Sequence, residues 1–330
     1  MNTVQVRAEK PYEVRIGSGL LDELGAELSR VCPGPTVALM ADDTVDTLYG
    51  ARAESSLRAA GKRVVRFAFA HGEPSKTLAT YAHMLDFLAE SQLTRADAVV
   101  ALGGGVTGDL AGFAAATYLR GVAVVQAPTS LLAMVDSSLG GKAGVDLPNG
   151  KNLAGAFHQP RLVLTDPQLL DTLPKAEWVD GSAEIIKHGV LKSERLFASM
   201  ERGELAGRRE EMITENVRIK AAFVAADETD RAARQQLNLG HTMGHPIELL
   251  SDYRVPHGQA VAMGMAMAAR MAAAHGLCSR DVPTRIERCL AACGLPVRAP
   301  YPAQALARAA LSDKKRSGDS ITLVLPRKIG

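Results

Sequence analysis

Residues 98–109 read Ala-Val-Val-Ala-Leu-Gly-Gly-Gly-Val-Thr-Gly-Asp, and this stretch decides the fold class of the chain. Its first five residues are apolar, which predicts a buried β-strand. The glycine cluster follows directly, and a helix is predicted from Leu110. Such a turn is typical of phosphate binding, because glycines let backbone N–H groups approach a pyrophosphate and the helix N-terminus favours its charge. The spacing differs from the usual dinucleotide fingerprint, so taken alone it also fits a tight turn.

Short apolar strands and helical segments alternate on both sides of this stretch. Strands are predicted at 4–7, 12–16, 37–40, 64–69, 98–102, 123–127 and 162–165. The first two could form a hairpin, and helices are predicted at 20–30, after the polar residues 41–44 up to 60, at 78–91 and from 110. This alternation predicts a Rossmann-like α/β domain, in which a parallel sheet carries helices on both faces.

The second half of the chain has helical patterns almost throughout. Helices are predicted at 175–188, 208–228, 241–250, 258–275 and 303–312, with a further helix starting at Asp281 and a closing strand at 321–325. The boundary between the halves is predicted between Thr165 and Lys175, where Asp166 and Pro167 end the last strand. We therefore expect an α/β domain over residues 1–170 and a mostly α-helical domain over residues 171–330.

The charge balance, apolar runs and cysteines of the chain limit which partners and which cellular locations are expected. The 330 residues include 38 Lys and Arg against 36 Asp and Glu, a net charge of +2. This near balance argues against nucleic acid or a membrane surface as the main partner. Charged residues interrupt the N-terminus before any apolar run, and no apolar run is long enough to span a bilayer, so we expect neither a targeting nor a spanning segment. The four cysteines show no Cys-x-x-Cys spacing, which favours reduced thiols in a cytoplasmic protein.

Histidines are concentrated near residue 240. Residues 238–248 read Asn-Leu-Gly-His-Thr-Met-Gly-His-Pro-Ile-Glu, and His241 and His245, four apart, share one face of a helix. His257 follows after a short turn-like segment. Three histidines fit a catalytic zinc site, although surface or core histidines would give the same spacing. Polar residues near an apolar helix cost free energy unless they bind something, so the polar residues just upstream favour a binding site. These residues are Lys220, Arg234 and Asn238.

Two further groups of residues suit anionic ligands. Residues 140–152 combine four glycines with Lys142, Lys151 and Asn152, which favours an anion held by charge and backbone over a solvated loop. Glu184 and Lys187 stand three apart on a predicted helix, so both can reach one site. A plain surface ion pair is the alternative for that second group.

The motifs of the first half are Gly-Glu-x-x-Lys (72–76), Gly-Gly-Gly-Val-x-Gly-Asp (103–109), Pro-Thr-Ser-Leu-Leu-Ala (128–133), Val-Asp-Ser-Ser (135–138), Gly-Gly-Lys (140–142) and Gly-Lys-Asn-Leu-x-Gly-Ala-Phe (150–157). The second half adds Ala-Glu-Ile-Ile-Lys (183–187), Leu-Asn-Leu-Gly-His-Thr-x-Gly-His (237–245), His-Gly (257–258) and Asp-Lys-Lys (313–315). With these motifs, the chain resembles the 3-dehydroquinate synthase family of the shikimate pathway nearly from end to end.

This resemblance implies an activity. Family members are NAD- and divalent-metal-dependent lyases that convert 3-deoxy-D-arabino-heptulosonate 7-phosphate to 3-dehydroquinate and phosphate. The implied steps are transient oxidation by bound NAD, elimination of phosphate, return of the hydride and an intramolecular aldol closure. The metal is zinc or cobalt, the first domain binds NAD, the second binds metal and substrate, and the assembly is a homodimer.

The resemblance also assigns residues. It implies Glu184, His241 and His257 as metal ligands, so His245 would serve the substrate instead of the metal. For NAD it implies Asp42, Glu73, Lys76, Gly105, Val106, Thr107, Gly108, Asp109, Thr129, Ser130, Leu169, Leu170, Asp171 and Thr172. Lys142 and Lys151 would reach both cofactor and substrate. Lys187, Lys220 and Arg234 would bind the substrate carboxylate, and Asp136 would lie near the reacting centre. Around the phosphate it implies Asn152, Asn238, His245, Arg120 and one of Lys314 or Lys315.

Two positions depart from the family pattern. Pro246 stands where alanine is common, so the helix must start close to His241 or be kinked there. Gln259 replaces a glutamate that is usual after the metal-binding His-Gly; if that glutamate supports a ligand, metal is held more weakly here.

Three rival functions remain at this point. A metal-dependent polyol dehydrogenase would share the glycine turn and the histidines, but it needs no cations for a carboxylate and a phosphate. A sister sugar phosphate cyclase would differ in its substrate pocket, and a carboxylate-free substrate is disfavoured by the three cations. A non-catalytic metabolite sensor is disfavoured because every implied catalytic position is occupied.

Overall fold

The computed structural model describes residues 1–311 and 321–330. Its contacts divide the chain into two compact units, Met1–Leu173 with Lys220–Thr229 and Pro174–Ile219 with Asp230–Gly330. The first unit contains the sheets and the second is helical, which confirms the predicted fold class. The functional division at residues 170 and 171 stays a prediction.

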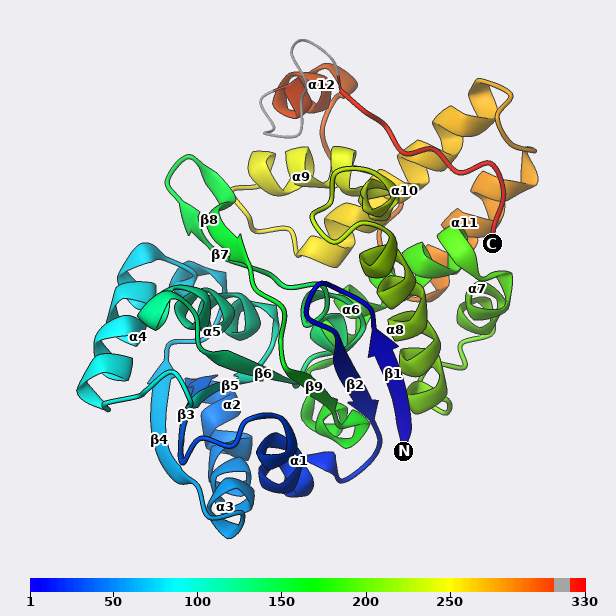
Figure 1. The fold of residues 1–330 in the computed structure, drawn as a ribbon. Helices are drawn as coiled ribbons and strands as arrows, with labels where there is room; N and C mark the ends of the chain where they lie inside the picture. Colours follow the sequence, from blue (N-terminus) through cyan, green and yellow to red (C-terminus); the bar gives the residue numbers. More distant parts are fainter. Residues whose placement is uncertain (312–320) are drawn as a thin grey trace. The chain divides into compact units, whose positions relative to one another are not determined.

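A seven-stranded sheet forms the centre of the first unit (Figure 1). Its order is β1-β2-β9-β6-β5-β3-β4, with the N-terminal pair antiparallel and every other neighbouring pair parallel. The predicted hairpin and parallel sheet are therefore confirmed. The strand bounds are β1 Asn2–Val6, β2 Tyr12–Ile16, β3 Thr36–Asp42, β4 Arg63–Phe69, β5 Ala98–Gly103, β6 Ala123–Pro128 and β9 Leu162–Thr165.

Helices cover both faces of this sheet. Figure 1 shows α4 and α5 on one side and α1 and α3 on the other. Buried Val99 and Ala101 of β5 pack in one core with Met84 of α4 and Leu110 of α5. The helical segments are η1 Leu20–Glu23, α1 Leu24–Val31, α2 Asp43–Val45, η2 Asp46–Gly50, α3 Ala51–Ala59, η3 Glu73–Ser75, α4 Leu78–Glu90, α5 Gly105–Thr117, η4 Tyr118–Arg120, η5 Ala133–Ser137 and η6 Pro167–Thr172.

The strand order reverses direction between β3 and β5. From β3 the chain continues outward to β4, whereas β5, β6 and β9 follow one another on the other side. In open α/β sheets, ligands bind beyond the carboxyl ends of the strands at such a reversal. The topology thus places Asp42, the last residue of β3, and Gly103, the last residue of β5, at the expected ligand position.

Two segments of the first unit differ from the sequence predictions. Helix α5 begins at Gly105 instead of Leu110. Glycine is a poor helix former and adds nothing to helical periodicity, so the sequence gives no helix signal for this first turn. Residues 142–157, for which no strand was predicted, form a hairpin of β7 Lys142–Leu147 and β8 Gly150–Phe157. A Cβ on Gly144 would lie 2.5 Å from the Ala154 carbonyl oxygen, so glycine allows a close approach of the strands while lowering the strand signal.

The second unit is built from helices. They are α6 Lys175–Lys192, α7 Glu194–Glu201, η7 Ala233–Asn238, α9 His241–Leu250, α10 His257–Ala274, α11 Asp281–Ala292 and α12 Ala303–Leu311, while α8 Arg209–Ala226 starts in this unit and ends in the first. The strand predicted at 321–325 is wrong, because the described part of this unit contains no strand with which it could pair. None of the helices described is long and apolar enough to cross a membrane.

Glycines bring three helices of this unit into close contact. A Cβ on Gly264 of α10 would lie 1.9 Å from the carbonyl oxygen of Gly240, which precedes α9. A Cβ on Gly258 would lie 2.0 Å from the carbonyl oxygen of Asp180 of α6. The absence of side chains at these positions lets α10 approach both neighbours, and so it determines where the first residues of α9 and α10 lie.

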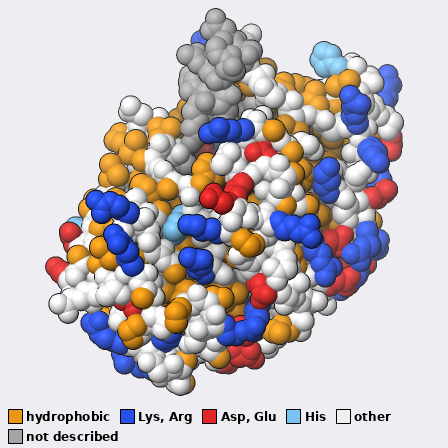
Figure 2. Space-filling model, viewed as in Figure 1, with side chains coloured by type: hydrophobic (Ala, Val, Ile, Leu, Met, Phe, Trp, Pro, Cys, Tyr) orange, Lys and Arg blue, Asp and Glu red, His pale blue; other side chains and the backbone are white. Residues whose placement is uncertain are grey.

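Charge is mixed over the visible surface. Figure 2 shows Lys and Arg side chains interspersed with hydrophobic and acidic ones on this face. That distribution agrees with the net charge of +2.

Candidate active site

Three side chains of the second unit form a group suited to a metal ion. Glu184 of α6, His241 of α9 and His257 of α10 each offer a ligand atom, and these atoms lie within 4.8 Å of one another. The Glu184 Oε1 atom is 3.6 Å from His241 Nε2 and 3.9 Å from His257 Nε2. The structure therefore brings together the three residues that the family resemblance implies as ligands.

Each histidine is the first residue of its helix. Gly240, with φ 83°, lets the chain turn into α9 at His241, so Pro246 is the sixth residue of the helix and lies just beyond its first turn. The helix thus starts at His241, as expected from the proline. Asp180, one turn before Glu184 on α6, accepts a hydrogen bond from the Gln259 backbone N–H at 3.2 Å and fixes the start of α10.

The outer ring nitrogen of both histidines has a partner. His241 Nδ1 lies 3.3 Å from the Leu239 carbonyl oxygen, and His257 Nδ1 lies 3.4 Å from Glu248 Oε2. With Nδ1–H donated in this way, Nε2 presents a lone pair toward Glu184. This is the tautomer that ligation through Nε2 requires.

The Glu184 carboxylate tests whether a metal fits. It is fully buried, and Lys187 of the same helix forms an ion pair with its Oε2. Among the described residues no hydrogen-bond donor reaches Glu184 Oε1. A buried carboxylate oxygen without a donor, facing two Nε2 atoms, is the donor set that a divalent cation such as zinc binds.

Buried charges around this group shift the pKa values of its neighbours. Burial lowers the pKa of His257, but the hydrogen bond and charge of Glu248, with the charges of Glu184 and Asp180, outweigh it and raise the pKa. Burial raises the pKa of Asp180 to about 6, although His257 and the Gln259 and Gly258 backbone groups oppose the shift. The surroundings of His257 are therefore strongly anionic, which favours a cation.

The first unit contains a second candidate region, at the strand-order reversal. The N-cap of α5, Gly104, supplies no side-chain hydrogen bond, so the first backbone N–H groups of the helix have no side-chain cap. A Cβ on Gly105 would lie 3.2 Å from Ser137 Oγ, which shows how closely the turn is surrounded. Uncapped N–H groups and a glycine surface suit the pyrophosphate of a dinucleotide.

Asp42 lies at the end of β3, beside this turn. Its Oδ1 accepts from the Val45 backbone N–H at 2.9 Å, and its Oδ2 accepts from Thr107 Oγ1 at 3.4 Å. A carboxylate on the strand adjoining the glycine turn is positioned to accept hydrogen bonds from a ribose. The structure thus joins Asp42 with Gly105, Val106, Thr107 and Gly108 in one region, as implied for NAD.

Lys76 is a buried cation that links three segments. Its Nζ donates to Asp109 Oδ2 at 2.5 Å and to Asn152 Oδ1 at 2.6 Å. Asn152, implied at the phosphate, has φ 54°, and its side chain accepts this hydrogen bond from Lys76. Glu73, three residues before Lys76, pairs with Lys151 of β8 at 3.1 Å.

The other implied residues of the first unit lie in several elements. Lys220 Nζ is 2.8 Å from Asp136 Oδ1. Lys220, which is implied to bind the substrate carboxylate, therefore forms an ion pair with Asp136, which is implied to lie near the reacting centre. Thr129 and Ser130 follow β6, and Lys142 is exposed at the start of β7. Leu169, Leu170, Asp171 and Thr172 lie in η6, where Tyr49 Oη donates to the Leu169 carbonyl oxygen at 3.0 Å.

The remaining implied substrate residues are divided between the units. Arg120 is exposed in η4 of the first unit. In the second unit, Arg234 is buried in η7, Asn238 ends η7, and the His245 ring centroid lies 5.6 Å from that of His241. Lys314 and Lys315 lie outside the described residues.

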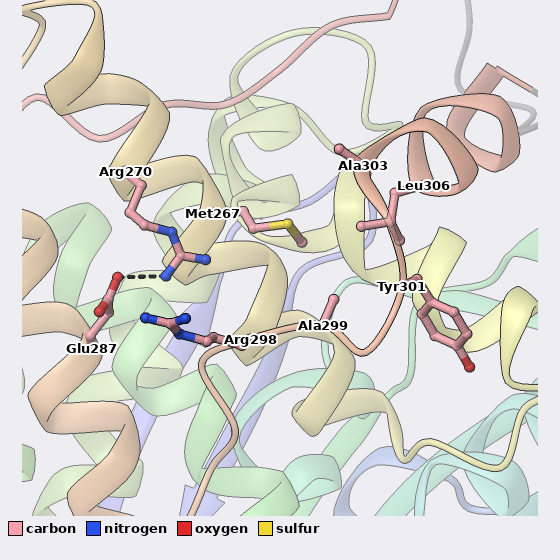
Figure 3. A pocket seen from close by; sticks show the side chains of 8 residues that line it. All are labelled: Met267, Arg270, Glu287, Arg298, Ala299, Tyr301, Ala303 and Leu306. Carbon is pink, nitrogen blue, oxygen red and sulfur yellow. Dashed lines mark hydrogen bonds and ion pairs between the residues drawn. The ribbon is translucent and has the colours of Figure 1, made fainter.

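A hollow of about 430 Å³ elsewhere in the second unit contains none of the implied residues. Figure 3 shows arginines at one end and apolar side chains at the other. Arg270 pairs with Glu287 at 2.6 Å and donates to the Val297 carbonyl oxygen at 3.3 Å, so it ties the 295–301 segment to two helices. The lining residues are Met267, Arg270, Glu287, Arg298, Ala299, Tyr301, Ala303 and Leu306.

Sequence reasoning missed two carboxylates beside the metal group. Glu248 closes the histidine stretch and Asp180 precedes Glu184 by one turn, so both stood near residues that were singled out. Their contacts, however, are made to the start of α10, a different helix. Spacing along one helix could not reveal a partner on another.

Comparisons with known proteins agree with these two regions. The family described as 3-dehydroquinate synthase N-terminal matches residues 66–180, and the family described as 3-dehydroquinate synthase C-terminal matches residues 181–316. A 3-dehydroquinate synthase of Pelotomaculum thermopropionicum is 45% identical, over 100% of this chain and 92% of the relative. One of Nostoc punctiforme is 42% identical, over 98% and 92%.

Solved structures of related cyclases have the same fold. A 2-deoxy-scyllo-inosose synthase complexed with carbaglucose-6-phosphate, NAD+ and Co2+ matches with a TM-score of 0.87 and 25% identity, over 100% of this chain and 93% of that one. A 2-epi-5-epi-valiolone synthase from Streptomyces hygroscopicus with NAD+ and Zn2+ bound matches with a TM-score of 0.87 and 28% identity, over 99% and 93%. A glycerol dehydrogenase of Schizosaccharomyces pombe, with a TM-score of 0.63 and 15% identity, shares the fold alone.

Proposed function

Because the chain belongs to the 3-dehydroquinate synthase family, we propose that it converts 3-deoxy-D-arabino-heptulosonate 7-phosphate to 3-dehydroquinate and phosphate. It is an NAD- and divalent-metal-dependent lyase. The observation that carries the proposal is the group Glu184, His241 and His257, in which a buried carboxylate oxygen without a donor faces two Nε2 atoms.

The two sets of residues serve one reaction. When bound, NAD supplies a hydride acceptor and the metal ion supplies a Lewis acid that lowers the pKa of a coordinated hydroxyl. Glu184, His241 and His257 hold the metal through one carboxylate and two Nε2 atoms. The uncapped N–H groups of α5 bind the pyrophosphate of NAD, and Asp42 accepts from its ribose. Glu73, Lys76, Asp109, Thr129, Ser130, Lys151 and residues 169–172 complete the proposed NAD site.

Cationic side chains make the site specific for the proposed substrate. Lys187, Lys220 and Arg234 bind the substrate carboxylate, since ammonium and guanidinium groups donate charge-assisted hydrogen bonds to carboxylates and Arg234 offers a bidentate fork. Lys220 is paired with Asp136 at 2.8 Å, so the carboxylate competes with Asp136 for this ammonium. Asn152, Asn238, His245 and one of Lys314 or Lys315 surround the phosphate, with Arg120, and Lys142 contacts both ligands.

The set of cations separates this function from the rival ones. The substrate of a polyol dehydrogenase carries neither a carboxylate nor a phosphate, so it would leave buried Arg234, Lys187 and Lys220 without an anionic ligand. The related cyclases of known structure share the fold, but the three cations favour a substrate that carries a carboxylate.

We further propose a homodimer in which Arg120 reaches the phosphate of the neighbouring subunit. Leu119 and Arg120 have φ of 50° and 67°, and both are exposed. Two consecutive non-glycine residues in the left-handed region are strained, and such strain persists where it serves a function. The expected cytoplasmic location stays a prediction.

A comparison of two substrates tests the proposed specificity. Purified protein with NAD and zinc or cobalt is incubated with the sugar acid phosphate or with a hexose 6-phosphate, and released phosphate is measured. We expect release from the sugar acid phosphate only, and we expect Arg234→Ala to slow it mainly through a higher KM. Release from the hexose phosphate alone would instead identify a cyclase of the carboxylate-free class.

A further inference from the structure

Glu248 is a buried carboxylate that the proposed reaction does not use directly. Only 3% of the residue is exposed, and its Oε2 lies 3.4 Å from His257 Nδ1. The same ring faces Glu184 Oε1 with its other nitrogen, at 3.9 Å. His257 is therefore held between two carboxylates, one on the side of the metal group and one behind it.

The position of Glu248 depends on helix α9. Pro246 and Ile247, which precede it, are buried, and Ile247 packs against Ala260 and Met263 of α10. The Glu248 backbone carbonyl accepts from Ser251 Oγ at 2.8 Å and from the Tyr253 N–H at 2.8 Å. These contacts anchor the segment that carries the carboxylate, so its side chain meets the first residue of α10 from a fixed direction.

The Nδ1 atom of His241 faces a different kind of partner from that of His257. Its Nδ1 faces a neutral backbone carbonyl, that of Leu239, at 3.3 Å. A carboxylate behind a ligating imidazole fixes the tautomer and raises the basicity of the other nitrogen more than a carbonyl does, because the hydrogen bond is charge-assisted. The Glu248 carboxylate is therefore expected to raise metal affinity more than the Leu239 carbonyl does.

We infer that Glu248 is the residue that positions His257 for metal binding and sets how firmly the metal is held. Gln259 does not take this role, because among the described residues its hydrogen bond is the one that its backbone N–H donates to Asp180 Oδ1 at 3.2 Å. The inference rests on the proposed metal site, and it assigns the support of His257 to α9 instead of to the residue that follows His-Gly.

The test compares zinc affinity in variants of similar volume. Metal content of the unaltered protein is measured first, because a protein that holds no zinc contradicts the proposed function itself. Zinc affinity is then measured by competition with a chromophoric chelator for Glu248→Gln, Glu248→Met and the control Gln259→Ala. We expect a loss of about 10–100-fold for the Glu248 variants, larger for Met, which offers no acceptor, and no change for Gln259→Ala. Equal affinities for Glu248→Gln and the unaltered protein would overturn the inference, as would a loss confined to Gln259→Ala.

A double-mutant cycle separates positioning from general structural damage. In the His257→Ala background the ring that Glu248 supports is gone, so Glu248→Gln should cause no further loss of zinc affinity. The d–d absorption of the cobalt-substituted protein gives a second readout, which should change for Glu248→Gln and stay unaltered for Gln259→Ala. A loss of the same size in both backgrounds, with an unaltered cobalt spectrum, would show that Glu248 acts through folding and not through His257.

Discussion

His245 stands one helical turn after His241, yet the two histidines have different proposed roles. The Nε2 atom of His241 is 3.6 Å from Glu184 Oε1, whereas no ligand atom of His245 belongs to the metal group. The spacing that first suggested a three-histidine site therefore does not decide ligation. Which histidines meet a carboxylate depends on how α6, α9 and α10 pack.

The pair gives a matched test of the ligand set. His241→Ala should lose zinc affinity by at least about 100-fold, since a three-residue catalytic site keeps only two ligands. His245→Ala should retain about one metal ion per chain, as expected for such a site, while losing activity. Metal analysis after dialysis against a chelator measures both. Equal loss of zinc from the two variants would place His245 among the ligands.

His158 provides a pH-dependent test at a distance from the metal group. Burial lowers its pKa, aided by Lys10 and Arg161, although the hydrogen bond to the Val122 carbonyl oxygen opposes the shift. The unfolded chain, titrating near pH 6.5, then binds more protons than the folded one as pH falls below that value. The contribution of His158 to stability is therefore lost progressively below about pH 6.5.

A variant isolates this contribution. His158→Gln keeps an N–H donor for the Val122 carbonyl oxygen but cannot titrate. The free energy of unfolding, measured with urea from pH 7 to pH 5, should fall less steeply for the variant than for the unaltered protein. Parallel curves for the two proteins would show that His158 does not have a lowered pKa.

Among the elements, the contact of α9 with α10 depends most on the absence of a side chain. Gly264→Ala should destabilise the fold by about 1–3 kcal/mol through overpacking, because its Cβ would lie 1.9 Å from the backbone oxygen of Gly240. This outweighs the gain of about 1 kcal/mol from replacing a helical glycine. Gly207→Ala is the control, since the nearest atom there is 4.0 Å away. Urea midpoints that are lowered equally by both substitutions would contradict the packing account.

The elements also show how far the sequence predicts the fold. The alternation of apolar strands and helices correctly predicted the parallel sheet. A strand that is buried on both faces of the sheet is apolar along its whole length, as residues 98–102 are. The β7–β8 hairpin was missed, since Gly144 and Gly155 serve the close approach of two backbones and carry no strand signal. Contacts that join distant elements, such as Glu248 with His257, have no local pattern at all.

At the scale of the whole molecule, the proposed homodimer predicts complementation. Arg120→Ala should impair phosphate binding in the neighbouring subunit, and Lys187→Ala should impair the carboxylate site of its own chain. Mixed dimers of the two inactive variants then contain one site with both defects and one with neither, so activity returns. If Arg120 served its own chain, every site would keep one defect. An inactive mixture, with heterodimers verified by mass spectrometry, would exclude the shared site.

The central claim is that bound NAD is reduced by the substrate and reoxidised within one turnover, while phosphate leaves and the ring closes. Its most direct measurement follows phosphate, 3-dehydroquinate and NADH absorbance together, with the sugar acid phosphate in large excess over NAD. We predict equal amounts of phosphate and 3-dehydroquinate, many turnovers per NAD and no lasting rise in NADH. NADH that accumulates in proportion to the substrate consumed, without release of phosphate, would contradict the account and identify a dehydrogenase.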